Sequence, residues 1–313
     1  TAAMATAREK GEQLTRFLCK VDAEDLELLG RDRAVKALEA ELLELAATSR
    51  PVLIQGEPGT GKELAARLLH FRGARCEGPL VCVDCAEIVA TQWGDQLFGP
   101  RGRPAGGSGV VSYVDLAAGG SLLLKNIERL PPPVAERLAR FLAGGELPVA
   151  ERPDVRILAT LRTASADAIG AVAPELARAF AGAVLRMPSL RERKRDLPLL
   201  ARRLLERHAA RRGKAIRGIE AAGVTKLVSH DYLAGNVREL EEAIERAVIL
   251  AEGETIRAEE IFLGLPPRDE GWRYNLLRLP SGLVRMALRL YPRPLRAAAA
   301  IGLLGIVLTC FLG

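Results

Sequence analysis

Apolar and polar positions divide this chain into regions with different periodicity. In the first region, short apolar runs alternate with stretches long enough to form helices. We interpret the runs as strands at 51–55, 80–83, 121–124, 155–160 and 183–187. Strands that alternate with helices of about ten or more residues are typical of βαβ units and a parallel sheet. Apolar residues on one face also predict a helix from Arg33 to about Ala47.

After Pro188 the strand-like runs stop. Helical periodicity predicts helices at about 195–211, 218–229 and 235–251, with no strands between them. This pattern favours a small all-helical subdomain. Residues 1–29 are polar with some helical periodicity, which predicts a linker helix.

A basic stretch and an apolar run stand at the end of the sequence. The chain has 313 residues, 49% of them hydrophobic, and a formal net charge of +6. Residues 268–313 carry seven Arg and two acidic residues, so most of the net positive charge of the chain lies there. The uncharged run 297–313 follows these arginines, as the positive-inside bias expects on the cytoplasmic side of a membrane. The pattern therefore predicts the start of a transmembrane helix. A nucleic-acid binder would usually carry its basic excess on the folded domain.

The cysteines offer a second candidate chemistry. Cys82 and Cys85 form a C-x-x-C pair, with Cys76 just upstream. Such a pair could belong to a metal or redox site. The surrounding LVCVDC, however, alternates like a buried strand, in which free cysteines pack as small hydrophobic residues. We therefore expect no metal site here, and a reducing cytoplasm as the compartment.

The sharpest motif is GEPGTGKE at residues 56–63, between the apolar run VLIQ and the helical pattern ELAARLLH. Glycines allow backbone N–H groups to turn toward phosphates, and the helix that follows adds its positive N-terminal end. Lys62 supplies a charge for the β- and γ-phosphates, whereas Glu63 stands where a Mg²⁺-binding Ser or Thr is usual. The pattern predicts a site for ATP or ADP, the alternative being a Gly-rich turn. The residues expected to bind nucleotide are Gly56, Glu57, Pro58, Gly59, Thr60, Gly61, Lys62 and Glu63.

GEPGTGKE resembles the GESGTGKE loop of the sigma-54-dependent transcriptional activators, AAA+ proteins that also have Glu in the last position. Other segments match in the same order. LLGRDRAVKALEAEL resembles the family's entry helix, QLFG its ELFG, and AAGGSLLLKNIERLP its Walker B region. PSLRERKRDLPLLA and GNVRELEEAIERAVILAEG are similar to the start and the last helix of its lid. The resemblance covers roughly residues 28–265, and Arg238 matches the lid arginine that senses nucleotide.

The Walker B segment departs from the family pattern. The family reads GGTLFLDEI, whereas this chain has GGSLLLKNI, so Lys125 replaces the Asp that helps to hold Mg²⁺. Asn126 replaces the Glu that activates water. A lysine repels Mg²⁺, and an amide cannot act as a general base. A positive Lys125 could also stand in for the metal by neutralising phosphate charge, which would keep binding and lose turnover.

Three further family segments differ. The GAFTGA loop that touches sigma-54 has no counterpart between Phe98 and Gly119. The sensor segment AATNR reads ATLRT at 159–163, without the Thr-Asn pair. In the stretch that carries the arginine fingers, both family Arg positions align with Ala173 and Ala179. A finger shifted by one residue to Arg178 is the alternative.

The resemblance implies an α/β fold: an AAA+ P-loop core with a parallel sheet and a small all-helical lid. The apolar run 297–313 adds the expectation of a C-terminal transmembrane helix after the lid. We divide the chain into a linker helix (1–29), a nucleotide-binding core (30–188), a lid (189–265), a basic juxtamembrane segment (266–296) and the start of the membrane helix (297–313).

We expect a membrane-attached regulatory protein that binds ATP or ADP with little or no hydrolysis. The substitutions argue against a bound Mg²⁺. One rival is an active ATPase that remodels sigma-54 RNA polymerase in transcription regulation, and another is a structural interaction module with a vestigial P-loop. The resemblance implies an AAA+ homo-oligomer as an assembly. We expect no sigma-54 contact, no direct DNA binding by this piece, and a cytoplasmic domain attached to the bacterial inner membrane.

Overall fold

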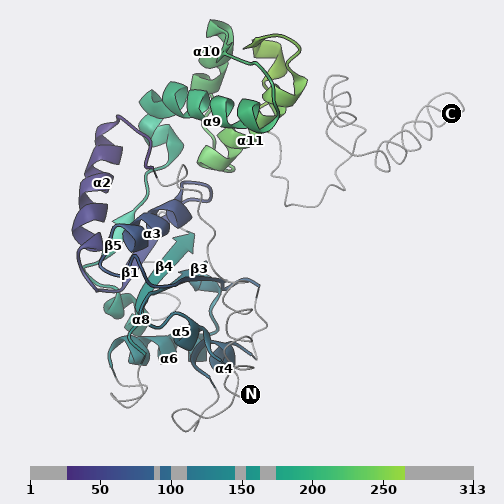
Figure 1. Ribbon diagram of the computed structural model, residues 1–313. Helices are drawn as coiled ribbons and strands as arrows, with labels where there is room; N and C mark the ends of the chain where they lie inside the picture. Colours follow the sequence, from purple (N-terminus) through teal and green to yellow (C-terminus); the bar gives the residue numbers. More distant parts are fainter. Residues whose placement is uncertain (1–26, 88–91, 100–110, 145–152, 163–173, 265–313) are drawn as a thin grey trace, which may run out of the picture. The chain divides into compact units, whose positions relative to one another are not determined.

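The computed structural model describes residues 27–87, 92–99, 111–144, 153–162 and 174–264 (Figure 1). It divides into two compact units, residues 1–193 and 194–313. The expected linker helix lies almost entirely outside the described residues. The expected juxtamembrane segment 266–296 and membrane helix 297–313 lie wholly outside them.

The first unit is built on a five-stranded parallel sheet in the order β2-β3-β4-β1-β5. The expected α/β class with a parallel sheet is confirmed, and each strand falls on one of the apolar runs. All five residues of the interior strand β1 are buried, because a parallel sheet is covered on both faces. The strands are β1 (Val52–Gly56), β2 (Leu80–Asp84), β3 (Ser121–Lys125), β4 (Arg156–Arg162) and β5 (Val184–Arg186).

Two helices, α2 (Arg33–Ala46) and α3 (Lys62–Phe71), pack against one face of the sheet. Asp32 begins α2, because its side chain accepts a hydrogen bond of 3.0 Å from the backbone N–H of Ala34. The buried residues of α2 repeat at helical spacing, so the expected apolar face is the one that covers the sheet.

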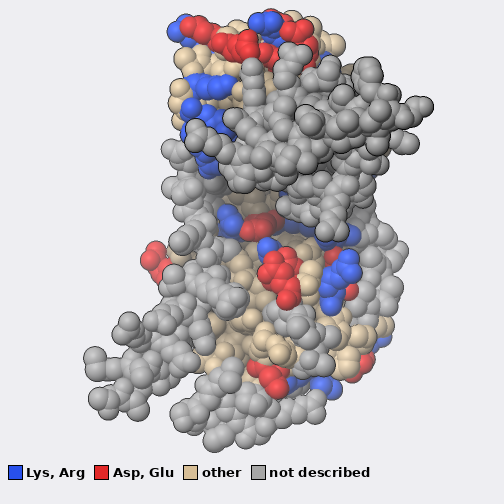
Figure 2. All heavy atoms as spheres, turned by 90° about the vertical axis from the view of Figure 1, so that its right-hand side faces the viewer, with Lys and Arg blue, Asp and Glu red and all other residues tan. Residues whose placement is uncertain are grey.

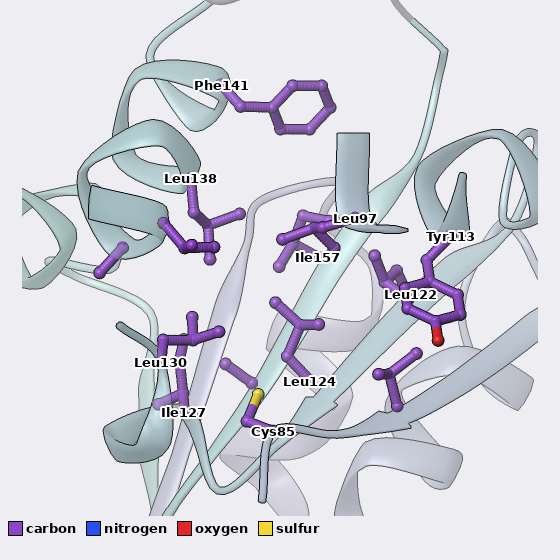
Figure 3. Close-up of a cluster of buried hydrophobic side chains, with 14 of the residues drawn as sticks. Cys85, Leu97, Tyr113, Leu122, Leu124, Ile127, Leu130, Leu138, Phe141 and Ile157 are labelled. Atoms are coloured by element: carbon purple, nitrogen blue, oxygen red, sulfur yellow. The ribbon is translucent and has the colours of Figure 1, made fainter. Parts of the chain in front are cut away.

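The opposite face is covered by shorter helices, whose side chains form a second apolar cluster with the sheet (Figure 3). These helices are α4 (Trp93–Phe98), α5 (Tyr113–Leu116), α6 (Pro132–Leu142) and α8 (Pro174–Ala179). A 3-10 turn, η2 (Ile127–Arg129), follows β3. The thiol of Cys85 points into this cluster, close to Leu124 in the view of Figure 3, and burial raises its pKa well above the usual range. Cys85 therefore packs as a small hydrophobic residue at the end of a buried strand.

The second unit contains α9 (Leu197–Arg211), α10 (Ala221–Ser229) and α11 (Asn236–Leu250), and a 3-10 turn, η4 (Leu190–Asp196), leads into it. Ion pairs between Arg207 and Glu241 and between Arg212 and Glu245 join α9 to α11. The helical lid is confirmed, but the expectation of an all-helical lid is wrong. Two-residue strands, β6 (Gly218–Ile219) and β7 (Thr255–Ile256), pair in parallel before the final 3-10 turn η5 (Ala258–Glu260).

The strand β6 occupies the first residues of the helix expected at 218–229, and α10 begins only at Ala221. The backbone N–H of Glu220 donates to Ile256, which holds this segment extended. Among the described residues, no helix is long and apolar enough to cross a membrane.

Candidate nucleotide-binding site

The loop from Glu57 to Gly61 joins the end of β1 to the start of α3. Gly59 and Gly61 have φ of 72° and 99°, in the left-handed region that residues with a Cβ rarely adopt. Gly61 is also the N-cap of α3, so this backbone conformation brings the loop to the positive end of the helix. The glycine spacing thus produces the strand–loop–helix geometry that phosphate binding requires.

Lys62 turns back over this loop. Its Nζ donates hydrogen bonds to the backbone carbonyls of Gly56 at 2.7 Å and Glu57 at 2.8 Å. The hydroxyl of Thr60 donates to the same Glu57 carbonyl at 2.9 Å. Side chains of Thr60 and Lys62 therefore hold the loop by hydrogen bonds to its own carbonyls, and these bonds fix the Lys62 ammonium above the loop backbone.

Two arginines that follow β5 in the chain contact residues of the loop. Arg191 forms a two-pronged ion pair with the carboxylate of Glu57, with hydrogen bonds of 2.7 and 2.5 Å. The buried guanidinium of Arg193 donates to the backbone carbonyl of Thr60 at 3.4 Å. Both arginines lie in η4, so the start of that turn is tied directly to the phosphate loop.

A second group of charged residues lies where β2 and β3 end. Asp84 and Lys125 are partners in the strand register. The Nζ of Lys125 lies 3.5 Å from Asp84 and 3.8 Å from Glu63, the second residue of α3. The amide of Asn126 donates to Asp84 at 2.8 Å. Because these strands are parallel, their carboxyl ends share one edge with the end of β1, where open α/β sheets bind ligands.

Asn126 takes a strained backbone position with φ of 55°, which Asn tolerates better than most residues. Its backbone N–H donates to the hydroxyl of Thr160 in β4 at 3.1 Å. This bond joins the altered Walker B segment to the altered sensor segment. The side chain of Asn126 is thereby held against Asp84.

The Asp84 carboxyl is kept ionised by its neighbours. Partial burial alone would raise its pKa, but hydrogen bonds from the Ala86 backbone and the Asn126 amide, together with the charge of Lys125, outweigh burial. The net effect holds the pKa of Asp84 below its ordinary value. Asp84 thus forms a stable anion beside the Lys125 ammonium.

The residues at this edge fit Mg²⁺ poorly. Magnesium needs oxygen ligands in near-octahedral geometry. Here the carboxylates of Glu63 and Asp84 flank an ammonium, and Glu63 also accepts a hydrogen bond of 2.6 Å from Arg67. Within the described parts of the chain, no group of three or more His, Cys, Asp and Glu residues could hold a metal. Figure 2 shows Lys and Arg side chains next to Asp and Glu side chains on one face of the molecule.

The structure brings some of the expected site residues together, and the others lie in α11, in α8 or outside the described residues. Residues 56–63 run from the end of β1 through the loop into the first turn of α3, and Lys125 lies at ion-pair distance from Glu63. Arg238 is exposed on α11 in the second unit. Ala179 ends α8, where Arg178 is exposed, while Ala173 lies outside the described residues.

Sequence reasoning missed Asp84, which we had read only as part of a strand. The available signal was an Asp directly after an apolar run, at the carboxyl end of a strand. A cavity between α6 and α8 also went unforeseen, but it is lined by residues such as Glu136, Arg140 and Arg178 and by none of the phosphate loop.

Sequence comparison shows which family shares this arrangement. The sigma-54 interaction domain matches residues 28–170, and the AAA+ ATPase lid domain matches residues 191–271. This chain belongs to the sigma-54 interaction domain family. The transcriptional regulatory protein ZraR of Escherichia coli K12 is 36% identical over 255 residues, which are 78% of this chain and 57% of ZraR. The chain thus spans a little over half the length of this curated relative.

Solved structures of NtrX from Brucella abortus have the same fold. The complex with ATP has a TM-score of 0.64 and 26% identity, and covers 75% of this chain and 56% of NtrX. The complex with ADP has a TM-score of 0.66 and 26% identity, and covers 85% of this chain and 60% of NtrX. The family match also corrects one expectation. We expected no sigma-54 contact because the GAFTGA motif is missing, but the sigma-54 interaction domain matches across that very segment.

Proposed function

We propose that this chain is the nucleotide-binding module of a regulatory protein, and that it holds ATP or ADP in the 56–63 loop with little or no hydrolysis. The observation that carries the proposal is the Lys62 ammonium, fixed above a glycine loop at the start of α3. The NtrX structures support it, because a relative with this fold was solved with each nucleotide.

Weak hydrolysis follows from the end of β3. Catalysis of phosphoryl transfer depends on a metal, a group that positions or activates water, and an arginine finger. Lys125 is a cation and Asn126 is an amide, so neither can bind the metal or accept a proton as the family's Asp and Glu would. Alanine at 173 and 179 removes both aligned arginines. One finger alone is worth about 10³–10⁵ in rate.

Titration of a fluorescent nucleotide tests the binding claim. We expect Lys62→Ala to weaken binding at least tenfold, because a charge-assisted contact to phosphate contributes about 1.5–3 kcal/mol. Lys36→Ala is the matched control, since Lys36 is an exposed lysine of α2 that pairs only loosely with Glu39 at 3.8 Å. Equal affinity of the wild type and Lys62→Ala would remove the basis of the proposal. Wild type that binds no nucleotide would favour a structural module with a vestigial loop.

The second candidate is an active ATPase that remodels sigma-54 polymerase, and the match to the sigma-54 interaction domain favours it. The two functions differ in turnover. Steady-state phosphate release near the median of ordinary enzymes, about 10 s⁻¹, together with open-complex formation in a purified transcription assay, would establish the second candidate.

We further propose that nucleotide occupancy sets the lid angle or the assembly state of a homo-oligomer on the cytoplasmic face of the bacterial inner membrane. The support for attachment is the uncharged run 297–313 behind its arginine-rich flank. Fractionation of cells that express the chain with and without residues 297–313 tests this. We expect only the longer form in the membrane fraction, and a longer form that stays soluble and monodisperse without detergent would contradict attachment.

A further inference from the structure

The ion pairs of Lys125 place a second ammonium beside the phosphate loop. Lys125 ends β3, and its Nζ lies 3.8 Å from Glu63, which directly follows Lys62 in the chain. The same Nζ lies 3.5 Å from Asp84. The site therefore offers two lysines from different elements, one held by the loop carbonyls and one held by carboxylates.

The Lys125 ammonium and a divalent cation cannot both bind between the carboxylates of Glu63 and Asp84. The carboxylates on each side of Lys125, Glu63 and Asp84, are the oxygen donors that a metal at this edge would need. To bind both, Mg²⁺ would have to come close to a like charge, which is strongly unfavourable in a partly buried site. The same two carboxylates already accept other hydrogen bonds. The Asn126 amide donates to Asp84 at 2.8 Å, and the Arg67 guanidinium donates to Glu63 at 2.6 Å.

The Lys125 side chain can also reach a phosphate. Its side chain is 29% exposed, and its stem is long and flexible. The ion-pair distances of 3.5 and 3.8 Å exceed the roughly 2.7–2.9 Å of a tight charge-assisted hydrogen bond. The ammonium can therefore turn from the carboxylates to a phosphate oxygen without breaking a short bond.

We propose that the Lys125 ammonium takes the place of the divalent cation, so that this domain binds nucleoside di- and triphosphates without Mg²⁺. The inference rests on the nucleotide binding proposed above. Lys62 and Lys125 then neutralise the phosphate charge from two sides. The nucleotide is held by fixed protein charges, and its binding does not follow the concentration of metal.

Affinity measured with and without metal tests the inference. A fluorescent ATP or ADP analogue is titrated against the whole chain in excess EDTA and in millimolar Mg²⁺. We expect the wild type to bind equally in both buffers within about twofold, and Lys125→Ala to bind at least about tenfold more weakly in EDTA, since it loses one charged hydrogen bond. Lys125→Asp should bind only with Mg²⁺. Lys125→Arg keeps the charge and should stay independent of metal.

The outcomes separate the two proposals. Wild-type binding that is lost in EDTA and present with Mg²⁺ would overturn the role of Lys125 and leave nucleotide binding intact. Wild type that binds in neither buffer would overturn both. Equal affinities of the wild type, Lys125→Ala and Lys36→Ala in EDTA would also overturn the role of Lys125. Thermal unfolding of each variant shows whether it folds, and Lys125→Arg serves as the test variant if Lys125→Ala does not.

Discussion

The two halves of the nucleotide site are built by different means. In the phosphate loop, the backbone does the positioning: Gly61 allows the turn, and carbonyls of Gly56 and Glu57 hold the Lys62 ammonium. At the ends of β2 and β3, side-chain contacts do the positioning: Lys125 forms an ion pair with Asp84, and the Asn126 amide donates a hydrogen bond to it. The contrast shows how a domain can keep the loop that binds phosphate while the residues needed for hydrolysis are replaced.

Restoring the family residues is expected to give the largest effect. In Lys125→Asp/Asn126→Glu, both acids return to β3, so nucleotide binding should become dependent on Mg²⁺ and some hydrolysis should appear. Turnover should remain about 10³-fold or more below that of an ordinary enzyme, because the arginine fingers are still absent. Steady-state phosphate release measures this. Full activity of the double variant would show that the substitutions at 173 and 179 do not matter.

A backbone change tests the other half of the comparison. Gly61→Ala forces a Cβ into φ of 99°, which costs about 1–2 kcal/mol. The added Cβ would meet only Met187, at 3.7 Å, so the cost lies in the backbone and not in a clash. We expect nucleotide affinity to fall about tenfold.

The matched control is Gly213→Ala in the lid, where φ is 62° and nothing lies within 4 Å of the added Cβ. It should lose a similar amount of stability and keep its nucleotide affinity. If both variants bind as the wild type does, the loop conformation is not what fixes the phosphate.

The smallest expected effect concerns the acid dependence of the carboxylate half. The pKa of Asp84 is lower in the folded chain than in the unfolded one, so Asp84 stabilises the fold above its unfolded pKa of about 3.9. That contribution is lost as the pH falls through the folded pKa.

Denaturant unfolding of the wild type and Asp84→Asn should therefore differ at pH 7, and the difference should begin to shrink only as the pH falls below about 4, toward the folded pKa of Asp84. Asp115→Asn is a suitable control, since Asp115 lies in α5 and accepts hydrogen bonds from Ser112, the N-cap of that helix. A difference between wild type and Asp84→Asn that is constant with pH would show that charge is not the cause.

Much of the sheet could be predicted because the interior strands β1, β3 and β4 are buried on both faces over nearly their whole length and so read as continuous apolar runs. The phosphate loop could be located because its glycines are needed for backbone conformation and lie close together in the sequence. The pairing of Lys125 with Asp84 depends on β2 and β3 being neighbours, which strand order decides and local sequence does not. The pairing of β6 with β7 could not be predicted, because two-residue strands show no alternation of apolar and polar residues and the two strands are far apart in the chain.

A single-turnover experiment tests the central claim most directly. ATP is mixed with an excess of the whole chain, the protein is separated from unbound nucleotide, and the bound nucleotide is released by acid and identified by ion-exchange chromatography. We predict that wild type retains intact ATP, in EDTA as well as in Mg²⁺, and that Lys62→Ala retains none. Rapid conversion of the bound ATP to ADP, or wild type that retains no nucleotide, would contradict the account.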